Sequence, residues 1–173
     1  SGKVCVVTGG AKGIGRSIVE GLLAEGACVA ILDRNAETLA TTVAELEAGQ
    51  KVVAFPVDVA DPSAVDAAFA KVREALGPVD VLVNNAGIMS YALVEDMSAE
   101  MWDEMMAINL RSMFLCSRAV VPDMKVKGWG RIINLSSQLA HKGAIELAHY
   151  SASKAAVLGF TRGFAREVIK HGI

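Results

Sequence analysis

The chain has 173 residues, enough for a domain with a substantial hydrophobic core. Hydrophobic residues make up 53% of it and the formal net charge is only -2, so the basic surface typical of nucleic-acid-binding proteins is missing. No apolar run approaches the roughly 18 residues that a membrane span requires, and the first residues enter an expected strand without a signal-peptide pattern. We therefore expect a cytoplasmic protein with neither nucleic acid nor a membrane as a partner.

Short apolar runs, rich in valine and isoleucine, alternate with longer segments of helical periodicity. Because the runs are continuous rather than alternating, they indicate strands that are buried on both faces of a parallel sheet. We expect the strands at residues 3–10, 27–33, 51–59, 79–87 and 130–137. We expect the helices at about 14–25, 35–48, 62–76, 98–125 and 149–170. This alternation predicts an α/β fold, a Rossmann-type doubly wound parallel sheet, in a single domain over residues 1–173.

The first strand ends in the glycine-rich sequence TGGAKGIG, which leads directly into the first expected helix. Gly9, Gly13 and Gly15 have the spacing G-xxx-G-x-G, close to the dinucleotide fingerprint but not identical to it. Glycines allow a sharp turn and a close approach of the backbone to a pyrophosphate, which the N-terminus of the helix attracts. Tight turns without a ligand also use glycine, so the interpretation depends on the rest of the chain. A P-loop is excluded because no Gly-Lys-Ser/Thr follows.

The second strand ends at Asp33, about 20 residues beyond the glycines. An acidic side chain at this position can accept hydrogen bonds from an adenosine ribose, although an ordinary turn residue is the alternative. A carboxylate would repel a ribose 2′-phosphate, which favours NAD(H). NADP(H) remains possible because Lys12 or Arg34 could bind that phosphate.

The third and fourth strands also end in polar or glycine residues. Ligands of open parallel sheets bind outside the carboxyl ends of the strands, so these residues gather where a cofactor is expected. Each of them alone could be turn chemistry, but together they indicate one binding edge. The further cofactor-binding candidates at this edge are Asp58, Val59, Asn85, Ala86 and Gly87.

Methionines gather on the fourth expected helix, at Met101, Met105, Met106 and Met113. They indicate either core packing, which base rates favour, or a helix face used for contacts between subunits. The three cysteines lack metal-site or disulfide spacing and are interpreted as small buried hydrophobes. The three histidines share no ligand spacing with a carboxylate or thiol, so we expect no metal.

The last expected helix carries Tyr150 and Lys154, one turn apart, and Tyr150 lies thirteen residues past Ser137. A loop of that length can return the helix so that both side chains face the serine, although a solvated surface pair is the plain alternative. A free tyrosine titrates near pH 10, and a neighbouring ammonium favours the phenolate. The tyrosine could then exchange a proton with a substrate oxygen that the serine hydroxyl holds. Hydride transfer itself would belong to a nicotinamide.

These motifs together resemble the short-chain dehydrogenase/reductase family. The matching features are TGxxxGIG at 8–15, NNAG at 84–87, Asn109, Ser137 and YxxxK at 150–154, in order along the whole chain. The resemblance implies that Tyr150 is the general acid/base, that Ser137 stabilises the substrate oxygen and that Asn109 belongs to a proton relay ending in water. It also implies that Lys154 favours the phenolate and, with Tyr150, contacts the nicotinamide ribose.

The family resemblance implies the cofactor contacts as well. Asp58 would approach the adenine, the NNAG segment would line the cleft and Ile14 would belong to the loop against the pyrophosphate. The segment 138–149 should border the substrate, with Leu139, His141 and Leu147 as candidates.

The implied activity is NAD(P)-dependent interconversion of a secondary alcohol and a ketone, with a small-molecule substrate and a homodimer or homotetramer. The general pattern is similar to 3-oxoacyl-acyl-carrier-protein reductases and to sugar-alcohol or hydroxysteroid dehydrogenases, and Asp33 counts against the NADPH-linked reductases. A non-catalytic dinucleotide-binding protein is the alternative, which the intact set of catalytic candidates argues against.

The chain also departs from the family pattern. A sixth strand, a Pro-Gly segment, a mobile substrate loop and a seventh strand should follow the last helix, but the sequence stops at KHGI. We therefore expect a C-terminally incomplete fold in which the fifth strand is an exposed edge.

Overall fold

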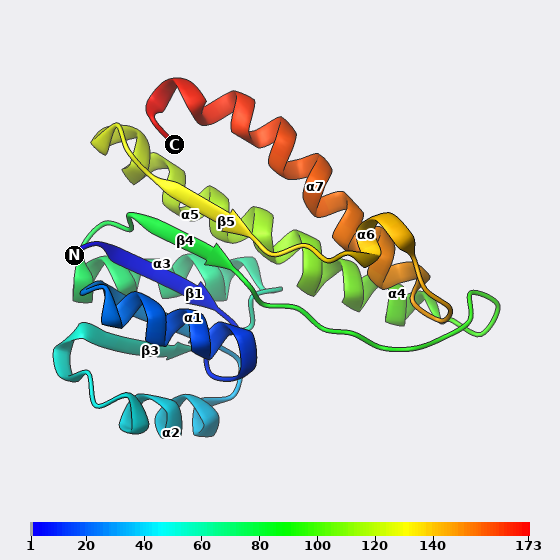
Figure 1. The fold of residues 1–173 in the computed structure, drawn as a ribbon, viewed down its shortest axis with the longest axis horizontal. Helices are drawn as coiled ribbons and strands as arrows, with labels where there is room; N and C mark the ends of the chain where they lie inside the picture. The colour runs from blue at the N-terminus through cyan, green and yellow to red at the C-terminus, as the bar shows by residue number, and fades with distance from the viewer. Residues whose placement is uncertain (1) are drawn as a thin grey trace.

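The strands of the sheet are short and all parallel. The computed structural model describes residues 2–173, in which five strands pair in the order β3-β2-β1-β4-β5 (Figure 1). The strands are β1 Val4–Thr8, β2 Cys28–Asp33, β3 Val52–Pro56, β4 Val81–Asn84 and β5 Arg131–Asn134. The chain moves from β1 outward to β3 and then crosses to β4 and β5, which confirms the predicted doubly wound sheet.

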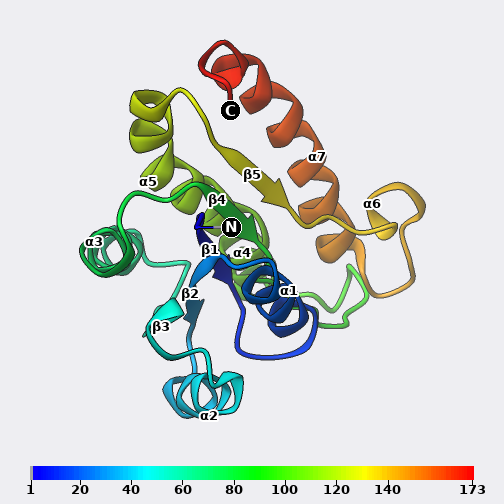
Figure 2. The same ribbon diagram turned by 60° about the vertical axis from the view of Figure 1, so that its left-hand side comes forward.

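Helices cover both faces of this sheet (Figure 2). They are α1 Gly13–Ala24, α2 Ala36–Leu46, α3 Pro62–Leu76, α4 Ala99–Met106, α5 Ser112–Lys127, α6 Leu139–Lys142 and α7 Ala148–Val168. Short 3₁₀ turns lie at Gly49–Lys51 and Ile169–His171. Side-chain caps fix two of the helix starts: Asp61 accepts a hydrogen bond from the Ser63 N–H at 2.8 Å, and Ser98 accepts one from the Met101 N–H at 3.2 Å.

The segment expected as one helix over 98–125 is divided in the structure. A π turn, Ala107–Arg111, separates α4 from α5 without breaking the helical path. The segment 138–149 also differs from the expected loop, because it contains the short helix α6. The Ser137 hydroxyl accepts a hydrogen bond at 3.2 Å from the N–H of Leu139, the first residue of that helix.

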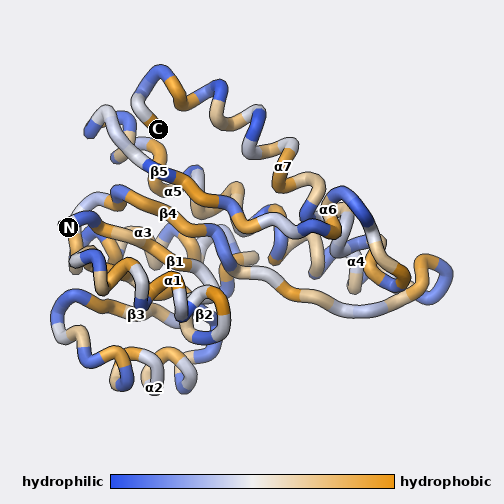
Figure 3. Tube along the Cα trace, viewed as in Figure 1, coloured by the Kyte–Doolittle hydropathy of each residue, from blue (hydrophilic) through white to orange (hydrophobic). Residues whose placement is uncertain are grey.

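Alternate residues of the central strands enter two separate hydrophobic clusters, one on each face. Val6 and Leu82 pack with α3 and α5 on one face, whereas Val7 and Ile31 pack with α1 and α2 on the other. Figure 3 shows the central strands largely in the apolar colour. Burial on both faces explains the continuous apolar runs of the sequence. β5 lies at the sheet edge and keeps Ile133 half exposed, as expected of an edge strand.

The methionines and cysteines mostly belong to the core. Met105 and Met113 are buried and Met101 and Met106 are partly buried, which supports core packing for the first two. Cys5 and Cys116 are buried as well, and Cys28 is partly buried. Burial raises the pKa of the Cys116 thiol to about 12, so this thiol is unreactive near neutral pH.

A buried carboxylate joins the starts of three strands. Asp80 accepts a hydrogen bond from the Val4 N–H at 2.9 Å, its own N–H donates to the Val4 carbonyl, and its carbonyl accepts from the Arg131 N–H. Lys127 lies 2.8 Å from its carboxylate and Lys3 lies 3.6 Å away. Burial alone would raise the pKa of Asp80, but the Lys127 and Val4 hydrogen bonds and the two cations outweigh it and lower the pKa.

Replacing Asp80 by asparagine should lower the free energy of unfolding by about 2 kcal/mol at pH 7, because the charge of a buried side chain and its attraction to two partly exposed lysines are lost. The pKa of Asp80 is lower in the fold than in the unfolded chain, so its carboxylate stabilises the fold above about pH 4 and ceases to do so as the pH falls through the folded pKa. Urea unfolding at several pH values checks both statements.

The matched control is Asp66→Asn, which removes an exposed partner of Arg118 at 3.5 Å. This change should lower the free energy of unfolding by less than about 0.5 kcal/mol. If both variants lose the same free energy of unfolding, Asp80 does not hold the starts of the three strands together.

Candidate active site

The glycine turn between β1 and α1 is explained by its own packing. Gly9 and Gly13 have φ values of 63° and 55°, a region that disfavours other residues. A Cβ on Gly15 would lie 2.1 Å from the Gly9 carbonyl oxygen, and one on Gly9 would lie 3.0 Å from the Ala86 Cα. Gly13 has open space around it. Two of the glycines therefore allow close packing within the protein, and Gly13 leaves the turn open on the side of the helix N-terminus.

The N-terminus of α1 is free of side-chain capping. Lys12, at the N-cap, makes no capping hydrogen bond with its side chain. The first N–H groups of the helix consequently lack a side-chain acceptor and lie at the wall of a cleft. Such a terminus suits a phosphate group, so the local structure fits a bound pyrophosphate.

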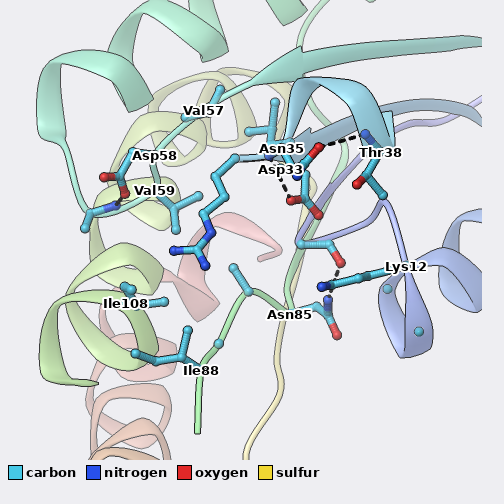
Figure 4. Close-up of a pocket in the computed structure, with 18 of the residues that line it drawn as sticks. Lys12, Asp33, Asn35, Thr38, Val57, Asp58, Val59, Asn85, Ile88 and Ile108 are labelled. Carbon is cyan, nitrogen blue, oxygen red and sulfur yellow. Dashed lines mark hydrogen bonds between the residues drawn. The ribbon is translucent and has the colours of Figure 1, made fainter. Parts of the chain in front are cut away.

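The cleft has a volume of about 670 Å³ and follows the carboxyl edge of the sheet (Figure 4). It collects every cofactor candidate named from the sequence except Tyr150 and Lys154. These lining residues are Gly9, Lys12, Gly13, Ile14, Gly15, Asp33, Arg34, Asp58, Val59, Asn85, Ala86 and Gly87. Ile14 is 69% exposed and lines the cleft.

The carboxylate of Asp33 connects the end of β2 with the glycine turn. One oxygen accepts a hydrogen bond from the Ala11 N–H at 3.2 Å, and the other accepts one from the Asn35 N–H at 3.4 Å. Each oxygen keeps a lone pair that a sugar hydroxyl could use. Lys12 and Arg34 line the same cleft, so the anion and both cations considered from the sequence face one ligand space.

The NNAG segment is fastened directly to the glycine turn. The Thr8 hydroxyl accepts hydrogen bonds from the N–H groups of Asn85 and Ala86, at 3.1 and 3.0 Å. The Asn85 amide donates to the carbonyl oxygens of Thr8 and Gly9, both at 2.9 Å. These bonds align the two walls of the cleft and give the asparagine a structural reason to be there.

Tyr150 and Lys154 lie on α7, as expected. The Lys154 Nζ lies 5.9 Å from the centre of the Tyr150 ring and donates a hydrogen bond to the Leu135 carbonyl at 3.0 Å. Lys154 is only 6% exposed, and this burial lowers the pKa of its ammonium. The Ser136 hydroxyl bonds to the Lys154 carbonyl at 2.8 Å and so ties the end of β5 to α7.

Gly87 is the point where the cleft reaches these groups. A Cβ at this position would lie 3.2 Å from Oδ1 of Asn109 and 3.5 Å from Nζ of Lys154. The same glycine lines the cleft. The cofactor candidates and the YxxxK helix are therefore parts of one continuous site.

Asn109 lies in the π turn and is buried. Its Oδ1 accepts a hydrogen bond from the Ile88 N–H at 2.7 Å, and its Nδ2 lies 3.0 Å from the Ile88 carbonyl and 3.1 Å from the Ser153 hydroxyl. The residue thus joins the segment after β4 to α7. π turns are frequent at functional sites. This one is close to Lys154, because Asn109 and Lys154 both lie next to Gly87.

The remaining candidates are spread around the substrate side. Ser137 uses its oxygen to accept from Leu139, which leaves its hydroxyl hydrogen for another acceptor. His141 is exposed on α6, and Leu139 is partly buried. Leu147, the N-cap residue of α7, is only 6% exposed. Its contact with a substrate stays a prediction.

Several residues of the site were not predicted from the sequence. Thr8 stands inside the quoted TGxxxGIG motif, but its bonds to the NNAG segment depend on tertiary structure. Thr38, Glu104, Ala107 and Ile108 are among the other residues that line the cleft, and nothing in their local sequence signals that.

Two further structural findings concern residues 2–173. No cluster of three or more histidine, cysteine, aspartate or glutamate side chains in this part of the chain could hold a metal ion. None of the helices described there has the length and apolar character to cross a membrane.

Comparisons with known proteins agree with this geometry. A family model described as short chain dehydrogenase matches residues 3–173. The chain is 40% identical to 2-dehydro-3-deoxy-L-rhamnonate dehydrogenase (NAD(+)) of Sphingomonas sp. (strain SKA58), covering 100% of this chain and 69% of that protein. It is 39% identical to the 3-oxoacyl-acyl-carrier-protein reductase of Escherichia coli (strain K12), covering 99% and 70%.

Solved structures give the same result. An NAD+-bound xylitol dehydrogenase superposes with a TM-score of 0.95 at 32% identity, over 100% of this chain and 67% of that one. A short-chain dehydrogenase from Streptomyces avermitilis superposes with a TM-score of 0.92 at 33% identity, over 99% and 63%. The chain thus spans about two thirds of the length of the proteins it matches.

Proposed function

The chain belongs to the short-chain dehydrogenase family, and from this premise we propose that the protein interconverts a secondary alcohol and a ketone with a nicotinamide dinucleotide as hydride carrier. The observation that carries the proposal is the position of Gly87, which lines the dinucleotide-sized cleft and lies against both Asn109 and Lys154. A cofactor bound along the cleft would therefore end beside the YxxxK helix, where proton transfer is needed.

In the direction of ketone reduction, Tyr150 donates its phenolic proton to the substrate oxygen as that oxygen gains charge. The Lys154 ammonium, 5.9 Å from the phenol ring, stabilises the resulting phenolate by its charge. Ser137 donates its hydroxyl hydrogen to the same substrate oxygen and holds it in place. In the direction of alcohol oxidation the substrate hydroxyl gives its proton to the Tyr150 phenolate. The nicotinamide, when bound, supplies or accepts the hydride.

Asn109 has a supporting part in this scheme. Its side chain already bonds to Ile88 and Ser153, and the Ser153 hydroxyl donates to the Tyr150 carbonyl at 2.7 Å. These bonds fix the position of the first turn of α7, which carries Tyr150, relative to the cleft wall at Gly87. We propose that Asn109 also belongs to the path by which Lys154 exchanges protons with solvent.

The rest of the cleft holds the dinucleotide. Gly13, Ile14 and the uncapped N–H groups of α1 would contact the pyrophosphate, and Asp33 would accept hydrogen bonds from the hydroxyls of the adenosine ribose. Asp58 and Val59 take the adenine end. Asp33 favours NAD(H), and two similar proteins carry NAD(+) in their descriptions, the rhamnonate-derivative dehydrogenase and the xylitol dehydrogenase.

The test is a panel of ketones and alcohols, including sugar acids, sugar alcohols and 3-oxoacyl thioesters, assayed on the full-length protein by nicotinamide absorbance. We expect turnover that depends on NAD(H) with at least one secondary alcohol or ketone. Saturable NADH binding with no turnover on any class would contradict the enzymatic proposal and favour a dinucleotide-binding role.

We also propose that the protein self-associates through a helical face. A hollow of about 760 Å³ lies between the end of α4, the π turn, α5 and α7, with Leu110, Phe114 and Phe160 among its lining residues. Phe114 and the nearby α4 residue Trp102 are 43% and 42% exposed. Large apolar side chains gathered on one face are typical of subunit contacts. Sedimentation of the full-length protein should give a mass above that of one chain, and a monomer would contradict this proposal.

A further inference from the structure

The segment that follows the NNAG motif is extended and alternates its side chains. Met89 and Tyr91 are 51% and 61% exposed, whereas Ile88, Ser90 and Ala92 are partly buried. The three inward residues face the π turn and the start of α7, because each of them makes a hydrogen bond in that direction.

The three bonds fasten the segment at regular intervals. The Ile88 N–H donates to Asn109 at 2.7 Å, and the Ala92 N–H donates to the Glu146 carbonyl at 3.0 Å. Between them, the Ser90 Oγ lies 2.9 Å from Nε2 of His149. This middle bond is the one made by two side chains, so it is the one that depends on residue identity at both ends.

His149 is an unexpected residue for its position. It is 0% exposed and lies in the first turn of α7, directly before Tyr150. Its Nδ1 has no hydrogen-bond partner among residues 2–173, which leaves Ser90 as the polar contact of the ring. Burying a polar ring with one nitrogen unpaired costs free energy relative to an apolar side chain. The bond to Ser90 offsets part of that cost.

The first turn of α7 needs an external support. Its N-cap residue, Leu147, makes no side-chain capping bond, so the turn is held by tertiary contacts rather than by its own capping. Tyr150 belongs to this turn, since α7 begins at Ala148.

We propose that His149 is a positioning residue for the proposed reaction, which acts by tying the Tyr150 turn to the segment 88–92 through Ser90. The inference rests on the proposed function of Tyr150 and adds a residue to it. The bond sets where the phenol stands relative to the substrate-side wall, and a small displacement of a reacting group lowers the rate steeply.

Two substitutions of His149 separate this role from simple core packing. In His149→Gln the side-chain amide nitrogen can reach the place of Nε2 and keep the bond to Ser90, whereas in His149→Asn it is too short to do so. Ser90→Ala removes the bond from the other end. We expect His149→Asn and Ser90→Ala to lower kcat about tenfold each, with roughly unchanged Kd for NADH. The double variant should be no worse than either single one, and His149→Gln should stay within about threefold of the parent.

Amide hydrogen exchange gives a readout that does not depend on turnover. In His149→Asn and Ser90→Ala the amides of residues 88–92 and of Ser151 should exchange faster than in the parent, and in His149→Gln they should not. Unchanged exchange in all variants overturns the inference, even if the parent protein shows no dehydrogenase activity and the proposed function fails on its own.

If the parent is active and His149→Asn keeps its kcat, the inference is wrong while the proposed function stands. A loss of kcat that parallels a loss of thermal stability, with no rescue by His149→Gln, would show a packing role only and would also overturn it.

Discussion

Replacing Tyr150 by phenylalanine is expected to lower kcat for ketone reduction by about 1,000-fold, because the phenol is the proposed proton donor and general acid–base groups contribute factors of this size. The ring itself should stay in place. Tyr150 is partly buried in the first turn of α7, and its ring packs 5.9 Å from the Lys154 ammonium, a contact that phenylalanine retains. The Kd for NADH should therefore change by less than roughly threefold, since no new cavity forms.

The chain offers a matched control, because it has only two tyrosines. Tyr91 lies in the segment after β4 and is 61% exposed. Tyr91→Phe removes the same hydroxyl from the substrate side of the protein and should leave kcat within about twofold of the parent. Stopped-flow and steady-state assays on both variants, with NADH binding followed by fluorescence, make the comparison. If the Tyr150 variant reduces ketones at the parent rate, the catalytic assignment is wrong.

The proposed role of Tyr150 depends on Lys154, and the structure gives this lysine an unusual setting. Its ammonium is buried, which lowers its pKa, and the Leu135 carbonyl accepts one of its hydrogens. An ammonium in a poorly solvated place exerts more of its charge on its neighbours than a surface lysine does. The alternative of a solvated Tyr–Lys surface pair is therefore excluded by the burial of Lys154.

The order of elements and the binding edge could be predicted from the sequence because they depend on local patterns. Continuous apolar runs mark strands that are buried on both faces, and β1, β2 and β4 each end within a run that was expected. The parallel arrangement then brings their carboxyl ends together. That Asp33, Gly13 and Gly87 line one cleft could therefore be predicted without knowing any side-chain contact.

The features that could not be predicted depend on contacts between distant segments. The π turn at Asn109 has no periodicity signal, since its neighbours on both sides are helical. The sequence explained Gly15 only by the approach of a pyrophosphate. In the structure, a Cβ at this position would first meet the Gly9 carbonyl oxygen. The Ser90–His149 bond joins residues that are 59 positions apart, and no local sequence pattern links them.

Replacing Asp33 by asparagine is expected to shift the preference of the protein from NAD(H) toward NADP(H) by about 100-fold, or about 2.7 kcal/mol. Two effects add. The amide accepts hydrogen bonds from the ribose hydroxyls less strongly than the carboxylate does, which weakens NADH binding. The loss of the negative charge also removes the repulsion of a 2′-phosphate, and Lys12 and Arg34 in the same cleft can then bind it. Asparagine keeps an oxygen for the Ala11 N–H, so the glycine turn should keep its shape.

The control for charge alone is Asp58→Asn, since Asp58 lines the same cleft at the adenine end. Removing the same unit of charge there should weaken NADH and NADPH binding to a similar degree and leave their ratio within about threefold of the parent, because the 2′-phosphate is recognised at the ribose. Fluorescence titrations of the two nucleotides against the parent and both variants give the ratios directly. A parent protein that prefers NADPH tenfold, or an Asp33 variant whose ratio does not move, would mean that Lys12 and Arg34 control the ribose pocket and that Asp33 serves only to hold the Ala11 and Asn35 N–H groups.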